Sequence, residues 1–293
     1  MIIGTRGSRL AVAQTNIVMA RLEELYPELG VEMKMIATTG DKVRDRPLKT
    51  LGGFGAFVKE LDDRILSGEI DVSVNSLKDM PVVPTEGTRI VAVLGRGPVE
   101  DVLVSERDLH ELPTGAVVGT SSVRRRALLL NLRPDLDVHD LRGNVTTRMN
   151  RLREGKYDAI VLARAGLDRL EVDCRHYVLD PKEFIPAVGQ GAIALSCAAD
   201  SPYSEKLAAL NDTETRLCVE AERYVLAGLG GGCSVPIGIW AVKELDHLHI
   251  RGIVLREDGR RAFRLDRCIE MANCRTGLNS FIDEMSKGCE GLR

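Results

Sequence analysis

The sequence predicts an α/β protein with two similar lobes, each built on a mainly parallel sheet, followed by a small C-terminal α+β domain with an antiparallel sheet. Three observations predict this fold. Strand and helix patterns alternate through the first two thirds of the chain, two segment pairs repeat in the same order, and consecutive strand patterns followed by a helix close the chain. Alternating strands and helices indicate parallel sheets, whereas consecutive strands before a helix indicate a separate α+β unit.

The strand–helix–strand pattern is clear between residues 31 and 74. Residues 31–35 and 70–74 alternate apolar and polar side chains, which is typical of half-buried strands. Between them, apolar residues recur at helical spacing from 57 to 65, and Gly68 stands where a helix end favours a left-handed residue. This segment therefore predicts a βαβ unit.

Two pairs of segments support a duplication. Residues 64–74 match residues 151–161 without a gap, and residues 3–5 match residues 118–120. One such pair alone would be expected in any protein built from βαβ units and would not indicate a duplication. Because both pairs occur in the same order, we expect two similar lobes.

These patterns set the expected domains. Lobe 1 comprises residues 1–95 plus about 190–210, lobe 2 comprises residues 99–187, and the C-terminal domain comprises residues 212–293. In that last domain, residues 211–213 can cap a helix that runs to about Gly228. Three strands and a last helix from about Thr276 follow, and the strands cover 237–242, 248–255 and 262–269.

Composition narrows the functional classes. The 293 residues carry a net charge of −3, with one Trp, five Tyr and five Phe for base stacking, so nucleic acid is not the expected partner. The chain has no run of about 18 apolar residues, so we expect no membrane span. The start of the chain lacks a signal-peptide pattern, and seven cysteines are an odd number, so we expect reduced thiols in the cytoplasm.

Cationic residues gather in three turns where strands should end and helices begin. These turns are residues 5–8, 119–126 and 142–148, and each combines arginine with small or hydroxyl residues. Helix N-termini and arginine bind anions, so the set indicates a polyanion site for a polycarboxylate, a phosphate ester or an oxyanion. The alternative for each single turn is a solvated helix start with ion pairs.

Two further residues are candidates for chemistry. Asp79, next to Lys78, follows the strand at 70–74 and would lie at the carboxyl end of the sheet, where active sites of parallel sheets lie. Cys233 lies in the glycine-rich stretch 230–236, which suits a nucleophilic thiol presented on a loop. No C-x-x-C pair occurs, so we expect no zinc site. The other six cysteines have no such context: Cys174, Cys197, Cys218, Cys268, Cys274 and Cys289.

Taken together, these motifs resemble the porphobilinogen deaminase family along almost the whole chain. Any one match could be chance, but eight stretches in order are highly specific. They are residues 4–8, 52–61, 76–81, 119–125, 142–148, 163–169, 186–192 and 231–238.

The resemblance implies a fold and a reaction. The lobes would be like those of periplasmic binding proteins. A transferase of tetrapyrrole (heme) biosynthesis would join four porphobilinogen molecules head to tail, release ammonia and yield hydroxymethylbilane. The family also implies a dipyrromethane cofactor held by a thioether, a monomer and no metal. By position, Cys233 is the attachment point and Asp79 is the catalytic residue.

The resemblance also assigns binding positions. The implied cofactor-binding residues besides Cys233 are Lys78, Ser122, Arg124, Arg125, Arg142 and Gly143. The implied substrate-binding residues are Arg6, Ser8, Gln14, Arg148 and Arg169. Because each pyrrole carries an acetate and a propionate, the growing chain would explain why arginines are abundant.

The chain departs from the family pattern at two positions. Asn75 stands where the family often has histidine, and Phe54 stands where it often has lysine. We expect residues 41–57, rich in glycine and charge, to form a mobile lid. Two alternatives stay open: a two-lobed anion- or solute-binding protein without catalysis, and a group-transfer enzyme that uses Cys233 with a histidine base.

Overall fold

The computed structural model describes residues 1–37, 55–230 and 235–292. Contacts divide the chain into two compact units. The first unit comprises Met1–Gly97 and Gly191–Leu217, and the second comprises Pro98–Gln190 and Cys218–Arg293. The division into three domains stays a prediction.

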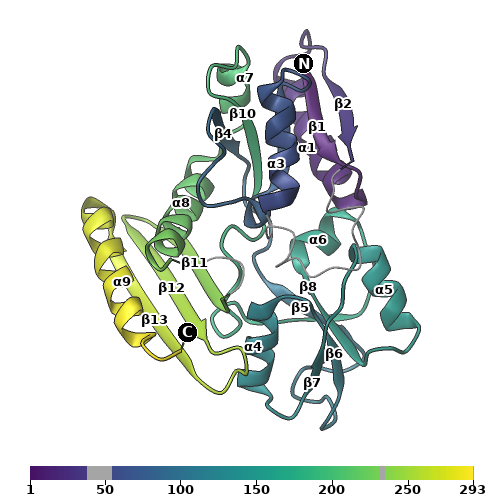
Figure 1. The fold of residues 1–293 in the computed structure, drawn as a ribbon, viewed down its shortest axis with the longest axis vertical. Coiled ribbons are helices and arrows are strands. Elements are labelled where there is room, and N and C mark those ends of the chain that lie inside the picture. Colours follow the sequence, from purple (N-terminus) through teal and green to yellow (C-terminus); the bar gives the residue numbers. More distant parts are fainter. Residues whose placement is uncertain (38–54, 231–234, 293) are drawn as a thin grey trace. The chain divides into compact units, whose positions relative to one another are not determined.

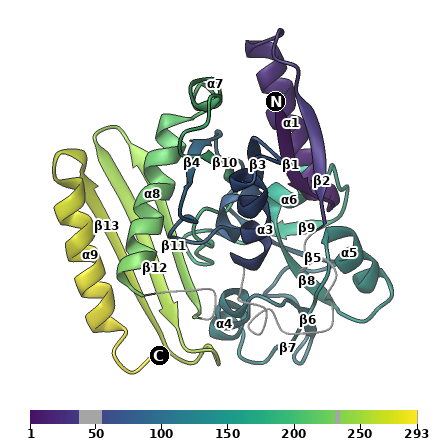
Figure 2. The same cartoon turned by 45° about the horizontal axis from the view of Figure 1, so that its top comes forward.

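The first unit is built on a five-stranded sheet in the order β2-β1-β3-β10-β4 (Figures 1 and 2). β1 is parallel to β2 and β3, whereas β10 is antiparallel to both of its neighbours, β3 and β4. The strands are β1 Ile2–Arg6, β2 Glu32–Ile36, β3 Val72–Ser76, β4 Thr88–Val93 and β10 Ile193–Ala198. The helices that accompany this sheet include α1 Arg9–Leu25, α3 Gly55–Leu66, the short 3-10 helix η2 Leu77–Asp79 and α7 Ser204–Ala208.

The second unit contains a sheet in the order β7-β6-β8-β5-β9. β6 is parallel to β7 and β8, whereas β5 is antiparallel to β8 and β9. The strands are β5 Asp101–Ser105, β6 Val117–Gly119, β7 Asp137–His139, β8 Ala159–Ala163 and β9 His176–Val178. The helices are α4 Val123–Leu132, α5 Val145–Arg153 and α6 Arg164–Arg169.

The two five-stranded sheets have the same plan. In each, four strands share one direction and the fourth strand in the order runs against them. The predicted pair of similar, mainly parallel lobes is therefore confirmed. Of the two matched segment pairs, the first ends in β3 and β8 and the second in β1 and β6, which hold equivalent places in the two sheets.

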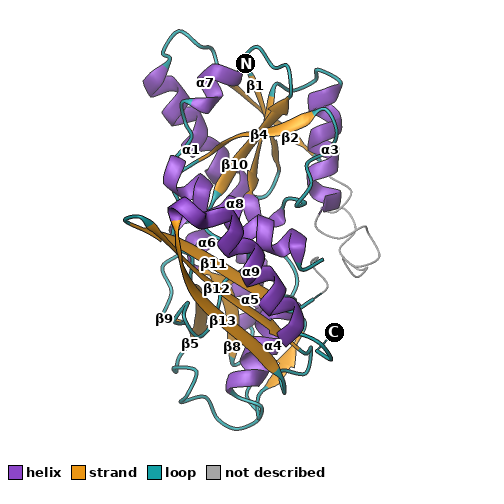
Figure 3. Ribbon diagram, turned by 90° about the vertical axis from the view of Figure 1, so that its left-hand side faces the viewer, coloured by secondary structure: helices purple, strands orange, loops and turns teal. Residues whose placement is uncertain are grey.

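The remaining part is an antiparallel sheet, β11-β12-β13, with α9 lying along it (Figures 2 and 3). Its strands are β11 Ile237–Glu244, β12 His247–Leu255 and β13 Ala262–Glu270, followed by η3 Met271–Asn273 and α9 Cys274–Gly288. The helix that precedes the sheet is α8 Thr213–Gly228, whose first turn is capped where Thr215 N donates to Asp212 Oδ1 at 2.7 Å. The predicted antiparallel α+β arrangement is confirmed.

Predicted element boundaries differ from the observed ones by small amounts with local causes. The strand expected at 70–74 starts at Val72, because Ile70 N donates to Arg64 O and so closes the end of α3. Gly68 has φ of +71°, as expected of a left-handed helix end. Within the described ranges, no helix has the length and apolarity needed to cross a membrane.

Candidate active site

The turn that carries Asp79 directly continues β3. Leu77 is 1% exposed and its N–H donates to Ala192 O at 3.0 Å, so the start of η2 is fixed to the residue directly before β10. Lys78 and Asp79 remain partly exposed on this turn. Asp79 therefore lies at the carboxyl end of β3, as the sequence predicted.

Residues of β1 and α1 lie at the same edge of this sheet. β1 and β3 pair in parallel, with Ile3 opposite Val72, so their carboxyl ends meet at one edge. Arg6 ends β1 and is partly exposed. Ser8 caps α1 by accepting a hydrogen bond from Ala11 N at 3.2 Å. The structure thus brings Arg6, Ser8 and the Asp79 turn to one edge of the first unit.

Gln14 holds the residue that precedes the Asp79 turn by hydrogen bonds. Its side chain is 2% exposed, Nε2 donates to Ser76 Oγ at 2.9 Å, and Ser76 Oγ donates back to Oε1 at 3.2 Å. Asn75, one residue earlier, is 6% exposed, and its amide donates to Ser73 Oγ at 3.0 Å within the strand. Both amides are therefore used to fix the end of β3.

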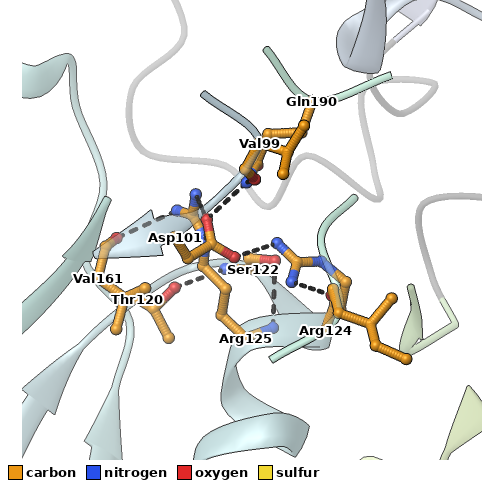
Figure 4. Close-up of polar contacts among 9 residues, drawn as sticks. Val99, Asp101, Thr120, Ser122, Arg124, Arg125, Val161 and Gln190 are labelled. Atoms are coloured by element: carbon orange, nitrogen blue, oxygen red, sulfur yellow. Dashed lines mark hydrogen bonds and ion pairs between the residues drawn. The ribbon is translucent and has the colours of Figure 1, made fainter. Parts of the chain in front are cut away.

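In the second unit, two neighbouring arginines share one buried carboxylate (Figure 4). Arg124 Nη2 lies 2.8 Å from Asp101 Oδ2, and Arg125 Nη2 lies 2.6 Å from Asp101 Oδ1. Asp101 is 0% exposed, Arg124 4% and Arg125 7%. Two positive charges and one negative charge leave a net charge of +1 in this buried cluster. An excess positive charge under low dielectric attracts an anion strongly.

The cluster shifts the acid–base behaviour of its members. Burial opposes ionisation of Asp101, but the charges and hydrogen bonds of Arg124 and Arg125 overcome it and hold the pKa of Asp101 well below its usual range. Burial lowers the pKa of Arg124, and the charge of Asp101 opposes this effect. Asp101 is therefore ionised at neutral pH.

Other groups complete the cluster. Arg124 Nη1 donates to Ile185 O at 2.8 Å, Arg125 Nη1 donates to Val161 O at 3.1 Å, and Gln190 Nε2 donates to Asp101 Oδ1 at 3.0 Å. Arg124 Nε is buried and has no hydrogen-bond partner among the described residues. A buried donor without a partner is costly, so this N–H is suited to an anionic ligand.

The family resemblance assigned Arg124 and Arg125, but not Arg126, to cofactor binding, and the surroundings of the three side chains also differ in the structure. Arg124 and Arg125 are buried on Asp101, whereas Arg126 is partly exposed and lies 3.1 Å from Asp140. Asp101 itself was missed. The available signal was an acidic residue that opens an otherwise apolar strand, since a buried carboxylate requires a partner.

Helices begin within the predicted turns at 119–126 and 142–148. Ser122 caps α4 by accepting from Arg125 N at 3.4 Å, and Asn144 caps α5 by accepting from Thr147 N at 2.9 Å. Gly143 has φ of +108°, which favours glycine. Arg148 Nε donates to Gly143 O at 2.8 Å, which closes this turn onto α5.

The remaining predicted site residues differ in how far the structure describes them. Arg142 Nη2 lies 3.9 Å from Asp140 Oδ2, and the Arg142 side chain is 34% exposed. Arg169 is the last residue of α6, and burial lowers its pKa while Asp168 opposes that effect. Cys233, Phe54 and most of the predicted lid lie outside the described residues. Within the described ranges, no cluster of His, Cys, Asp or Glu could hold a metal ion.

Comparisons with known proteins give a consistent result. The family model "Porphobilinogen deaminase, dipyromethane cofactor binding domain" matches residues 1–206, and "Porphobilinogen deaminase, C-terminal domain" matches residues 216–276. A probable porphobilinogen deaminase of Methanosarcina acetivorans is 46% identical over 276 residues, covering 92% of this chain and 86% of the relative. A porphobilinogen deaminase of Syntrophobacter fumaroxidans is 45% identical over 277 residues, covering 93% and 90%.

Similarity to solved structures is more distant. The methionine binding protein MetQ has a TM-score of 0.44 and 12% identity, covering 78% of this chain and 93% of that protein.

Proposed function

Because this chain belongs to the porphobilinogen deaminase family, we propose that Asp79 is its catalytic residue and that Cys233 carries its cofactor. The chain is a transferase with porphobilinogen deaminase activity in tetrapyrrole biosynthesis, and porphobilinogen is its substrate. Family membership favours this enzyme over the solute-binding alternative. The position of Asp79 at the carboxyl end of β3 is the observation that carries the catalytic assignment.

The proposed reaction joins four porphobilinogen molecules head to tail into hydroxymethylbilane. In each step the aminomethyl C–N bond of one substrate breaks, ammonia leaves, and the substrate carbon becomes a cation conjugated with its pyrrole ring. A C–C bond then forms between this carbon and the free carbon of the terminal pyrrole of the growing chain, which loses a proton. After four additions, the bond that joins the product to the protein breaks and water adds at the methylene carbon so released, which becomes the hydroxymethyl group.

Asp79 suits this chemistry because it is a partly exposed carboxylate on a pinned turn. Its oxygens can accept hydrogen bonds from pyrrole N–H groups and stabilise the developing cation. A carboxylate so held can also accept the proton released when the C–C bond forms. Lys78, the preceding residue, offers a cation for a substrate or cofactor carboxylate.

The residues of the second unit fit a dipyrromethane group, which is the cofactor of this family. That group carries several carboxylates, and the buried cluster supplies a net charge of +1 and the buried Arg124 Nε. When bound, the cofactor supplies the pyrrole to which the first substrate is joined. The residues proposed to hold it are Cys233, Lys78, Ser122, Arg124, Arg125, Arg142 and Gly143.

The residues proposed to bind substrate are Arg6, Ser8, Gln14, Arg148 and Arg169. The arginines would bind the acetate and propionate groups, for which a guanidinium offers paired donors. Gln14, whose amide is engaged with Ser76, would act through the turn that it supports. We also propose that the protein is a monomer, as the family resemblance implies, and that it acts in the cytoplasm, as the odd number of cysteines indicates.

Intact mass under denaturing conditions tests the cofactor assignment. We expect the wild type to carry a covalent excess of two linked pyrroles and Cys233→Ser to carry none. Cys268→Ser is the matched control, because Cys268 is an exposed thiol on β13. An equal excess on Cys233→Ser, or its loss in Cys268→Ser, would contradict the assignment. If the wild type shows only the bare mass, incubation with porphobilinogen and a second mass separate lack of substrate from a wrong proposal.

A further inference from the structure

A buried carboxylate outside the site described above lies on α3. Asp62 is 2% exposed, and Thr85 Oγ1 donates to its Oδ2 at 2.6 Å. Its other oxygen, Oδ1, is buried and accepts no hydrogen bond from any described residue. The cofactor and substrate assignments do not use Asp62, so its burial needs a separate explanation.

Asp62 belongs to the face of α3 that packs on the turn before β4. Leu66 is four residues further along the helix, so it shares this face with Asp62. A Cβ built on Gly87 would lie 2.9 Å from Leu66 Cδ2, which shows how closely α3 approaches the turn. α3 therefore contacts the turn at two points, the Asp62–Thr85 hydrogen bond and the Leu66–Gly87 approach.

Thr85 is a fixed point of that turn. Its carbonyl accepts hydrogen bonds from Thr88 N at 2.9 Å and from Thr88 Oγ1 at 2.8 Å, and β4 begins at Thr88. Thr85 is linked to Asp79 by residues 80–84, which include Pro81 and Pro84. Because proline fixes φ, a short segment with two prolines has little freedom between its ends. The position of Thr85 therefore restrains Asp79.

The N-terminal end of the Asp79 turn, at Ser76 and Leu77, is fixed by other hydrogen bonds. Leu77 N donates to Ala192 O, and Ser76 exchanges hydrogen bonds with Gln14. These contacts fix where the turn begins. The Asp62–Thr85 hydrogen bond is the corresponding contact on the far side of Asp79.

A carboxylate is an expensive choice at this place. Burial raises the pKa of Asp62, the Thr85 hydrogen bond acts in the opposite direction, and the charge of Asp63 raises it further. An apolar side chain would avoid this desolvation, so packing alone does not account for an acid here. The need for a strong hydrogen-bond acceptor for the Thr85 hydroxyl does account for an acid at position 62.

We infer that Asp62 is a positioning residue for the known reaction, which fixes Asp79 by anchoring Thr85 at the far end of the segment 80–84. This inference rests on the proposed role of Asp79. Asp62 acts on the placement of the catalytic carboxylate and not on the binding of substrate carboxylates. Removing the Asp62–Thr85 hydrogen bond is therefore expected to lower kcat and to leave KM unchanged.

The test compares two changes of Thr85 in holoenzyme whose cofactor content has been verified by intact mass. Thr85→Val removes the donor with little change in shape, and Thr85→Ser keeps it. We expect Thr85→Val to lower kcat about 10-fold with KM within about twofold, because a small misplacement of a catalytic group has effects of this order. We expect kcat of Thr85→Ser to stay within about threefold of the wild-type value.

Asp62 variants complete the cycle. Asp62→Asn keeps an acceptor and should retain most of kcat, whereas Asp62→Ala should match Thr85→Val. The double variant Asp62→Ala/Thr85→Val should be no slower than the slower single variant, since both remove one contact. Asp63→Glu, which changes an exposed neighbour and keeps its charge, is the matched control.

Two results would overturn the inference: an unchanged kcat in Thr85→Val, or multiplied losses in the double variant. A lower melting temperature with unchanged kcat would show a merely structural role. If Asp62→Ala does not fold, the Thr85 pair decides alone. Asp79→Asn in the same assay separates the two proposals: if it turns over normally, the role of Asp79 is wrong.

Discussion

Asp101 Oδ1 lies 2.6 Å from Arg125 Nη2, and both side chains are buried. The same carboxylate binds Arg124 through its other oxygen at 2.8 Å. A single acid therefore fixes two arginines that follow one another in the chain. Such a pair could otherwise point in opposite directions, because consecutive residues of a helix do not share a face.

Removing the carboxylate of Asp79 should abolish turnover and leave the fold intact. Asp79→Asn keeps the shape and hydrogen-bonding capacity of the side chain but cannot balance a cation or accept a proton. We expect kcat to fall by at least about 100-fold, measured as ammonia release from porphobilinogen. Circular dichroism should be unchanged. Near-normal turnover would refute the catalytic assignment.

Arg125→Ala should impair cofactor assembly. With Arg124 and Asp101 alone, one positive and one negative charge cancel, so the excess charge that favours carboxylates disappears. The measurement is the fraction of purified protein that carries the covalent mass excess, followed by elongation kinetics. Arg126→Ala is the matched control, because Arg126 pairs with Asp140 at the surface. Equal cofactor content in both variants would contradict the prediction.

Asp101→Asn should destabilise the protein, because it leaves two buried guanidinium groups without a counter-charge. Breaking a buried pair costs about 3–5 kcal/mol, which urea denaturation can measure. Asp135→Asn removes the partner of Arg133 at a much more exposed site, so we expect a smaller loss. Equal losses of unfolding free energy in the two variants would show that burial of the Asp101 cluster adds nothing to the cost of removing its carboxylate charge.

Asp101→Asn should also change how the stability of the protein depends on pH. The folded-state pKa of Asp101 is lowered below the ordinary value of 3.8, so its contribution is fully present above that value. The contribution is lost as pH falls through the folded-state pKa. In the wild type, the free energy of unfolding should therefore decline below about pH 4, and the decline should be shallower in Asp101→Asn. Parallel declines in the two proteins would exclude Asp101 as the source.

Gly143→Ala should destabilise the turn between β7 and α5. Gly143 has φ of +108°, and a Cβ built there would lie 2.7 Å from Thr147 Cγ2. We expect a loss of about 1–3 kcal/mol in the free energy of unfolding, together with lower cofactor content. Gly155→Ala is the control, because Gly155 has φ of +70° with no atom near its Cβ position. The difference between the two variants measures the close contact with Thr147; no difference would mean that the turn adapts to it.

What the sequence predicted well was local. Helices were predicted to begin in the turns at 119–126 and 142–148, and the caps at Ser122 and Asn144 depend on hydrogen bonds to residues three positions away, so a short pattern is sufficient to indicate them. Gly68 was likewise predicted from its position after a helix pattern. The order of the motifs along the chain was specific enough to identify the family.

What the sequence did not reveal depends on distant segments. Asp101 meets Arg124 and Arg125 only when β5 and α4 pack together, and nothing near Asp101 in the chain indicates that pairing. The Asp62–Thr85 contact joins a helix to a turn in the same way. Nor did the patterns show that β10 lies between β3 and β4, because strand order is a property of the assembled sheet.

That placement of β10 has a consequence for protein synthesis. Among the strands of the described residues, β4 pairs only with β10, and β10 ends at Ala198, about a hundred residues after the end of β4 in the chain. Residues 98–190 emerge in the interval, and they contain every strand of the second five-stranded sheet. The lobe that is synthesised first is therefore the one that completes its sheet last, and during translation β4 must wait without a strand partner.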